Sequence, residues 1–165
     1  MEMSSSRQVP APREAVWAAL NDPEFLKSCI AGCERIEAIG DHAYRISMVT
    51  RIGSIRAKFN GKMQLADLRP PESYTLVFEG EGGMAGFAKG KAEVTLTPDG
   101  AGTVLTYAAT AQIGGKLAQL GSRLIDAAAN KTADGFFSAF AEKLAAGAPD
   151  KQAAAPAALQ EGTPG

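Results

Sequence analysis

Alternating hydrophobic and polar positions dominate the middle of the chain. Six such runs follow one another between Glu34 and Ile113, and glycine or proline turns separate them. A period of two residues is typical of strands with one buried face, and short turns between consecutive runs favour antiparallel pairing. A seventh, weaker run opens the chain, so the pattern predicts an antiparallel sheet of about seven strands. The expected strands cover residues 1–9, 35–40, 42–49, 54–68, 73–82, 86–97 and 103–113.

Helical patterns occur in two places. After the first strand, Pro12 and Pro23 suit the first turns of two short helices. After Ile113 a glycine pair ends the last strand, and the residues up to Leu144 predict one helix of about thirty residues. A strand, two short helices, a meander and a long final helix form the α+β element order of the helix-grip fold, in which a curved sheet wraps the last helix.

The predicted last helix carries two apolar stripes, the second rotated by roughly a third of a turn on the helical wheel. The first stripe consists of Leu117, Leu120, Gly121, Leu124, Ile125 and Ala128. The second consists of Phe136, Phe137, Phe140 and Leu144. We interpret the phenylalanine stripe as an anchor in the concave core and the first stripe as an aliphatic lid beside a cavity mouth. The alternative is a helix that curves around an ordinary core, with a kink at Gly135.

The predicted strand 54–68 shows which face of the sheet is apolar. Ile55, Phe59 and Met63 share one face, whereas the basic side chains between them share the other. Small residues recur on the apolar face and fill less volume than Leu or Ile would. Two interpretations stay open: the missing volume is room for a ligand, or the small residues only let the sheet bend. The small residues are Ala57, Gly61, Gly80, Ala88, Gly90, Ala109 and Ala111.

Composition bounds the size and the partners of the protein. The chain has 165 residues and a net charge of −1, which suits one domain, expected over residues 1–146, and disfavours nucleic acid as a partner. Residues 147–165 are rich in Ala, Pro and Gly and are expected to form a flexible tail. No apolar run is long enough to cross a bilayer, and the first residues lack a signal-peptide pattern, so a cytoplasmic location is expected.

Residues with catalytic or metal-binding potential are few. Cys29 and Cys33, with the single histidine His42, cannot complete a four-ligand zinc site, and we expect two reduced, partly buried cysteines and no metal. One imidazole in a turn supplies no triad, so we expect no catalytic residues and a protein that is not an enzyme. The glycine-rich segment 80–91 continues as a strand and not as the helix that a P-loop requires. We expect a hairpin at the cavity rim, with Met84 and Phe87 near its tip.

Basic side chains gather on the predicted outer face of the sheet. They are Arg51, Arg56, Lys58, Lys62, Lys89 and Lys91. Charged side chains on the exposed face of a sheet usually only keep that face in contact with water. The alternative is that this face meets an acidic partner or anionic lipid headgroups, to which each basic residue adds about 1 kcal/mol.

Three blocks of the sequence closely resemble one family. VPAPREAVWAALNDPEFLKSCIAGCERIE, GEGGMAGFAKGKAEVTL and GGKLAQLGSRLIDAAANKTADGFFSAF are similar to the CoxG family of carbon monoxide dehydrogenase subunits, within the START-like, or SRPBCC, superfamily. The resemblance covers about residues 1–146. Two departures stand out: Ala31 occupies a position where the family commonly has proline, and the tail contains no apolar or amphipathic anchor segment.

The resemblance implies a helix-grip domain with a hydrophobic cavity. It implies an accessory protein that works with a carbon monoxide dehydrogenase-type molybdenum hydroxylase and links that enzyme to the inner face of the cytoplasmic membrane. It also implies a lipophilic ligand, an isoprenoid quinone such as menaquinone, and no cofactor of the protein's own. The alternatives are a START-like cyclase or hydrolase acting on a polycyclic substrate, and a ligand-free assembly or anchoring factor.

An apolar chain needs a dry groove of Leu, Phe and Met, and its headgroup needs one or two polar donors. The expected headgroup contacts are Tyr74 and Gln112. The expected cavity residues are Phe59, Met63, Leu76, Phe78, Met84, Phe87, Tyr107, Leu117, Leu120, Leu124 and Ala128.

Overall fold

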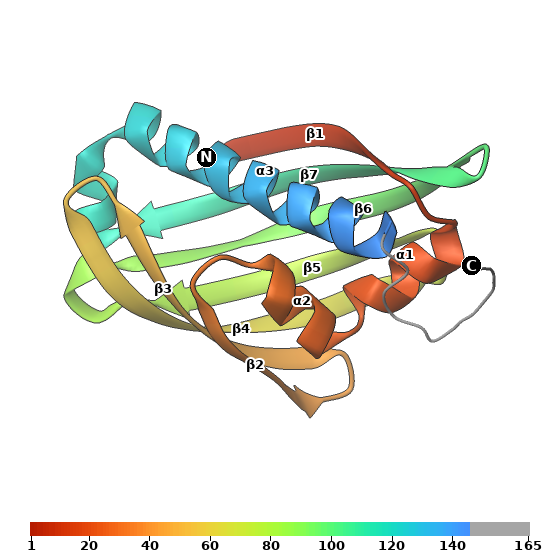
Figure 1. Ribbon diagram of the computed structural model, residues 1–165. Helices are drawn as coiled ribbons and strands as arrows, with labels where there is room; N and C mark the ends of the chain where they lie inside the picture. The colour runs from red at the N-terminus through yellow and green to blue at the C-terminus, as the bar shows by residue number, and fades with distance from the viewer. Residues whose placement is uncertain (146–165) are drawn as a thin grey trace.

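A seven-stranded antiparallel sheet and one long helix make up most of the molecule (Figure 1). The computed structural model describes residues 1–145. The strands lie in the order β1-β7-β6-β5-β4-β3-β2, so that β2 to β7 form a meander and β1 pairs with the last strand. The elements are β1 (Glu2–Val9), α1 (Arg13–Leu20), α2 (Pro23–Cys29), β2 (Cys33–Gly40), β3 (Ala43–Ile52), β4 (Ile55–Arg69), β5 (Ser73–Glu81), η1 (Gly83–Ala85), β6 (Phe87–Asp99), β7 (Gly102–Gly114), η2 (Gly115–Leu120) and α3 (Ser122–Ala145).

The sheet curves around α3, and the two short helices α1 and α2 lie at one end of its concave side (Figure 1). The α+β fold class predicted from the alternation is therefore confirmed. Local chemistry explains the short helices. Asp22 caps α2 by accepting hydrogen bonds from the backbone N–H groups of Glu24 and Phe25, and Pro23 occupies the first turn. The predicted tail, residues 147–165, lies outside the described residues.

The expected single helix after Ile113 is wrong in its first part. Residues Gly115–Leu120 form the 3₁₀ segment η2, and α3 begins only at Ser122. Gly121 separates the two with a φ of 90°, a conformation that favours glycine and that an α-helix cannot contain. Of the two stripes, Leu117 and Leu120 therefore lie on η2, whereas Leu124 and Ala128 lie on the first half of α3.

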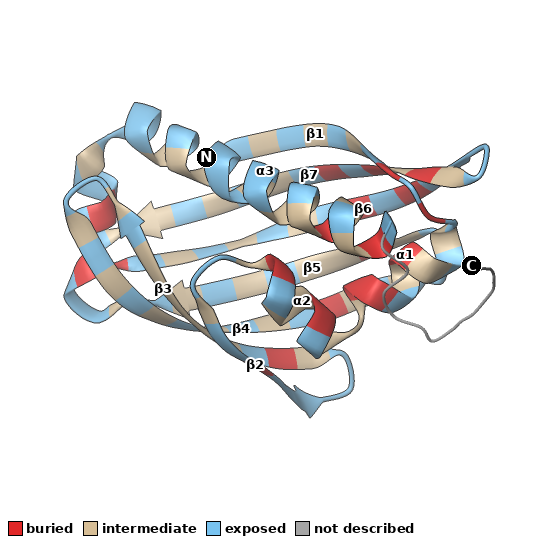
Figure 2. Ribbon diagram, in the orientation of Figure 1, coloured by how far each residue is buried: buried red, intermediate tan, exposed pale blue. Residues whose placement is uncertain are grey.

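The packed core occupies one end of the concave side. Buried residues gather where α1, α2 and the second half of α3 meet the sheet, and the opposite end carries few of them (Figure 2). Phe140 of α3 is 0% exposed and packs edge-on against Phe25 of α2, with ring centroids 5.4 Å apart. Leu144 is also buried. The second stripe thus anchors α3 in the core, as predicted.

The two cysteines are reduced side chains with no disulfide between them. Cys29 is buried at the end of α2, and Cys33 is half-buried at the start of β2. Burial is the main cause that raises the pKa of both thiols above the ordinary value of 9.0. The prediction that both cysteines are at least partly buried is confirmed.

Candidate functional site

The inner face of the sheet divides into a closed half and an open half. Along β4, alternate residues from Ile55 to Leu65 point inward, as the pattern predicted. Leu65 is buried, but Phe59 and Met63 on the same face are only half-buried. Leu76 and Phe78 of β5 are likewise half-buried. These side chains leave the sheet on its concave side, the side that α3 crosses (Figure 1).

Small residues continue the open half across β6 and β7. Ala88 and Gly90 pair with Ile113 and Ala111, and all four are half-buried. The matching part of α3 covers them thinly, because none of its residues between Ser122 and Ala139 is fully buried. We call this part of the inner face, around Phe59, Phe78, Gly90 and Ala111, the open half.

Three loops meet at the far end of the open half. Leu120 and Leu124 lie over the β3–β4 turn at Gly53, where an added Cβ atom would meet the Leu124 Cδ2 atom at 3.2 Å. Gly86 at the end of η1 packs against Gly115 at the start of η2. Figure 1 shows these loops together, opposite to α1 and α2. We call this end the loop tip.

Several predicted lid and rim residues lie at the loop tip or beside it. Leu117 is 5% exposed, whereas Leu124 is 39%, Phe87 41% and Met84 80% exposed. Ala128 is half-buried on α3. The structure thus brings the expected rim together, with Met84 projecting furthest into solvent.

A polar cluster that the sequence reasoning missed lies at the border between the two halves. Arg7 of β1 points to the concave side, because its ladder partner is the buried Leu105 of β7. Its Nη2 donates to the Oδ1 of Asp134 on α3. The Arg7 Cζ atom lies 5.3 Å from the ring centroid of Phe137, and that ring stacks on Tyr107 with centroids 5.4 Å apart.

The charge on Arg7 is well supported. The hydrogen bond to Asp134 is the main cause that raises the pKa of Arg7 above its ordinary value, and Tyr107 contributes less in the same direction. Alternation places the other charged side chains of the described strands on the outer face or at turns. Arg7 is therefore a cation at an inner-face strand position, next to the predicted cavity residue Tyr107. Its register with Met3, Ser5 and Val9 was the signal in the sequence.

The two expected headgroup contacts lie apart from the open half. Tyr74 is buried in the closed half against Trp17 of α1, with ring centroids 5.5 Å apart. Its burial raises its pKa far above the ordinary value of 10.0. Gln112 of β7 is exposed and lies on the outer face beside Lys89, its ladder partner. Neither side chain enters the site described above.

The outer face of the sheet holds two shallow hollows. They have volumes of about 490 and 560 Å³ and share Glu2, Lys91 and Thr110 in their walls. Outward-facing residues of β1, β6 and β7 make up most of both walls, and the larger hollow extends to β5. Residues of the inward register contribute as well: Met3 and Ala109 line the smaller hollow, and Phe78, Gly90 and Ala111 line the larger one. The larger one contains Gln112.

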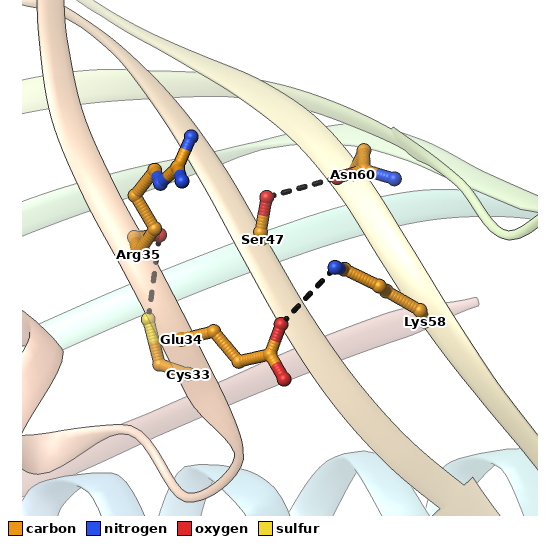
Figure 3. A network of polar contacts seen from close by, with 6 residues as sticks. All are labelled: Cys33, Glu34, Arg35, Ser47, Lys58 and Asn60. Atoms are coloured by element: carbon orange, nitrogen blue, oxygen red, sulfur yellow. Dashed lines mark hydrogen bonds and ion pairs between the residues drawn. The ribbon is translucent and has the colours of Figure 1, made fainter.

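The six predicted cations are all exposed on the outer face, among acidic neighbours. Lys58 forms an ion pair with Glu34 at 3.3 Å across β3, beside a hydrogen bond of 2.8 Å from Ser47 to Asn60 (Figure 3). Glu79 lies opposite Lys62 on one side and Lys89 on the other. Arg51 and Arg56 instead face each other beside the β3–β4 turn. Arg51 and Arg56 therefore place two positive charges side by side next to the loop tip.

Within residues 1–145, no group of three His, Cys, Asp or Glu side chains is arranged to hold a metal ion. None of the helices in this part of the chain is both long and apolar enough to span a membrane.

Comparison with known proteins identifies relatives over nearly the whole described chain. Residues 6–145 match the CoxG family of carbon monoxide dehydrogenase subunits, which confirms the resemblance seen in the sequence. No curated protein matches the chain.

Solved structures share the fold. A conserved protein from Geobacillus kaustophilus is 32% identical, with a TM-score of 0.84 over 89% of this chain and 97% of its own. A START superfamily protein from Mycobacterium smegmatis is 14% identical, with a TM-score of 0.65 over 87% of this chain and 98% of its own. The Zhui aromatase/cyclase from Streptomyces sp. R1128 is 12% identical, with a TM-score of 0.64 over 91% and 96% of the two chains.

Proposed function

Because the chain belongs to the CoxG family of carbon monoxide dehydrogenase subunits, we propose that it is an accessory protein of a carbon monoxide dehydrogenase-type molybdenum hydroxylase. It binds an isoprenoid quinone such as menaquinone on the open half of its inner face. It carries this ligand between the membrane and the enzyme. The protein itself catalyses no reaction.

The half-buried state of the inner-face aromatics is the observation that carries the proposal. Phe59 and Phe78 point to the concave side yet lie outside the packed core. Leaving large apolar side chains partly in water costs about 25 cal/mol per Å² of exposed apolar surface. A prenyl chain that covers Phe59, Phe78 and the small residues beside them recovers that free energy. The thin cover from Leu124 and Ala128 gives the chain a way in along α3.

A cyclase function, as the name of the Streptomyces relative suggests for that protein, has less support. Acid–base chemistry on a polycyclic substrate needs titratable groups that face the substrate. The inward positions of β4 to β7 in the open half carry Phe, Met, Ala, Gly and Ile. Such a surface suits binding better than proton transfer.

A titration of the full chain with menaquinone-4, followed by native mass spectrometry, tests the binding. The wild-type protein is expected to bind one menaquinone-4. Leu124→Arg places a charge over the entrance and is expected to weaken binding at least tenfold. Both Leu124, at 39% exposure, and the control position Val77, at 46% on the outer face, tolerate arginine without unfolding. Normal binding by Leu124→Arg, or equal losses in Leu124→Arg and Val77→Arg, would contradict entry beside α3.

At the membrane, the protein docks on anionic lipid through the loop tip. Met84 and Phe87 are exposed apolar groups there, and the exposed cations Arg51, Lys116 and Arg123 belong to the same end. Apolar groups that enter the headgroup region, ringed by cations, are the combination that binds peripheral proteins to anionic bilayers. Docking at this end would bring the open half close to the lipid chains.

Cosedimentation with phosphatidylglycerol vesicles tests this docking. The wild-type protein is expected to bind these vesicles at low salt and to bind phosphatidylcholine vesicles much less. Met84→Asp should reduce the binding several-fold. The control Ile39→Asp changes a residue of 43% exposure on β2 and should bind normally. Equal binding by all three proteins would exclude the loop tip as the docking surface.

A further inference from the structure

We propose that Arg7 binds the polar end of the lipophilic ligand, with its guanidinium exchanging Asp134 for a hydrogen-bond acceptor of that ligand. The inference rests on the proposed function and assigns its polar subsite. The acceptor is a carbonyl oxygen in a quinone, and a carboxylate in a fatty acid offers the same chemistry.

The position of Arg7 is the first argument. Along β7, Leu105 and Tyr107 are buried, whereas Ala109 and Ala111 are half-buried, so the change from closed to open half falls just past Tyr107. Arg7 pairs with Leu105 in the ladder and reaches Phe137 and Asp134 on α3. Its charge therefore stands where an apolar chain lying in the open half would end.

The surroundings of the guanidinium are the second argument. It lies over Phe137, and Phe137 stacks nearly parallel on Tyr107, at an interplanar angle of 17°. The half-buried Phe137 thus puts apolar aromatic surface beside a group with five N–H donors. A planar head with a carbonyl oxygen uses both features at once.

The present partner of Arg7 is the third argument. The side chain of Asp134 is 63% exposed, and that of Arg7 is 26% exposed. An ion pair this open to water is weak, because water competes for both charges. Exchange of Asp134 for a ligand acceptor therefore costs little, since the released carboxylate is already solvated.

Three probes and two variants distinguish this binding role from a purely structural one, in which the Arg7–Asp134 pair only holds α3 against the sheet. The probes are menaquinone-4, palmitate, and squalene as an isoprenoid hydrocarbon without an acceptor. The variants are Arg7→Met, which keeps the apolar stem over Phe137, and Asp134→Asn, which removes the competing carboxylate. Dissociation constants come from native mass spectrometry, and thermal unfolding verifies that each variant is folded.

We expect Arg7→Met to weaken menaquinone-4 binding about tenfold or more, the effect of losing a hydrogen bond to a charged group, and to leave squalene within about twofold. Asp134→Asn should bind menaquinone-4 as tightly as the wild type or more tightly. If the Arg7–Asp134 pair only held α3 against the sheet, Asp134→Asn would weaken menaquinone-4 binding, because either variant would free α3 and weaken the binding of every probe. Loss of squalene and menaquinone-4 alike in Arg7→Met, or weaker binding of menaquinone-4 in Asp134→Asn, would overturn the proposal.

Three further outcomes distinguish failure of the polar subsite at Arg7 from failure of quinone binding. If palmitate binds in an Arg7-dependent manner and menaquinone-4 does not bind, the polar subsite stands and the quinone ligand is wrong. If the wild-type protein binds none of the three probes, the proposed function fails, and the subsite fails with it. If Arg7→Met does not fold, Asp134→Asn alone decides, through the sign of its effect on menaquinone-4.

Discussion

Removal of the Phe140 ring should destabilise the protein more than removal of any exposed phenylalanine ring. Phe140 is 0% exposed, and its ring contacts Phe25 and Phe136 at centroid distances of 5.4 and 5.6 Å. Phe→Ala substitutions at such sites cost about 3–5 kcal/mol, because the transfer free energy is lost and a cavity remains. For a domain of this size the melting temperature falls by about 2–4 °C per kcal/mol, so Phe140→Ala should lower it by about 6–20 °C.

Phe87→Ala is the matched control, because the same atoms are removed from a residue that is 41% exposed at the loop tip. Its cost should stay below about 1 kcal/mol. Thermal and urea unfolding, followed by far-ultraviolet circular dichroism, give both values. Equal destabilisation by the two substitutions would refute the view that the core is confined to the α1–α2 end and that the loop tip is free for binding.

Three further predictions concern single residues. Burial raises the pKa of Tyr74 and also that of Tyr44, so the folded state loses stability as the pH rises above about 10, where the unfolded chain ionises. Tyr74→Phe should reduce this loss, measured as the difference between the free energies of unfolding at pH 8 and pH 11. Gly135→Ala should raise the free energy of unfolding by about 0.5–1 kcal/mol in urea titrations, because an added Cβ atom meets nothing within 4 Å and alanine favours the helix. At pH 8, Cys33→Ser, which retains the buried Cys29, should react with a disulfide reagent more slowly than Cys29→Ser, and urea should abolish the difference.

The strands and the anchor of α3 could be predicted because both follow from local periodicity. Along β4, every second residue from Ile55 to Leu65 is apolar or glycine and the residues between them are polar, which is the two-residue period of a strand. The phenylalanine stripe of α3 has the spacing of one helical face. Its burial against α2 confirms that the second half of the helix is the anchor.

The break between η2 and α3 was harder to predict from the sequence than the strands were. The residues of η2 keep helical spacing, since 3₁₀ and α-helical periods are close over six residues. Gly121 was the available sign, but an isolated glycine also occurs inside helices. With the break in place, Leu120 and Leu124 pack on the β3–β4 turn at Gly53, a contact between distant parts of the chain that local periodicity does not contain.

For the polar residues of the site, part of the placement could be predicted from the sequence and part could not. Alternation with Ala111 and Ile113 already assigned Gln112 to the outer face, so its placement there followed from the pattern. Arg7 stood in an inward register of the first strand, but its partner Asp134 is 127 residues away. Local periodicity cannot pair residues over that distance. Only the fold brings β1 and α3 together.

The central claim is that the open half of the inner face holds a prenylated quinone. The most direct test is organic extraction of the full chain, purified without detergent from a menaquinone-producing bacterium, with liquid chromatography and mass spectrometry of the extract. We expect menaquinone in near-stoichiometric amount, and much less from Leu124→Arg prepared in the same way. An extract without isoprenoid quinone, from protein that also fails to take up added menaquinone-4, would contradict the claim.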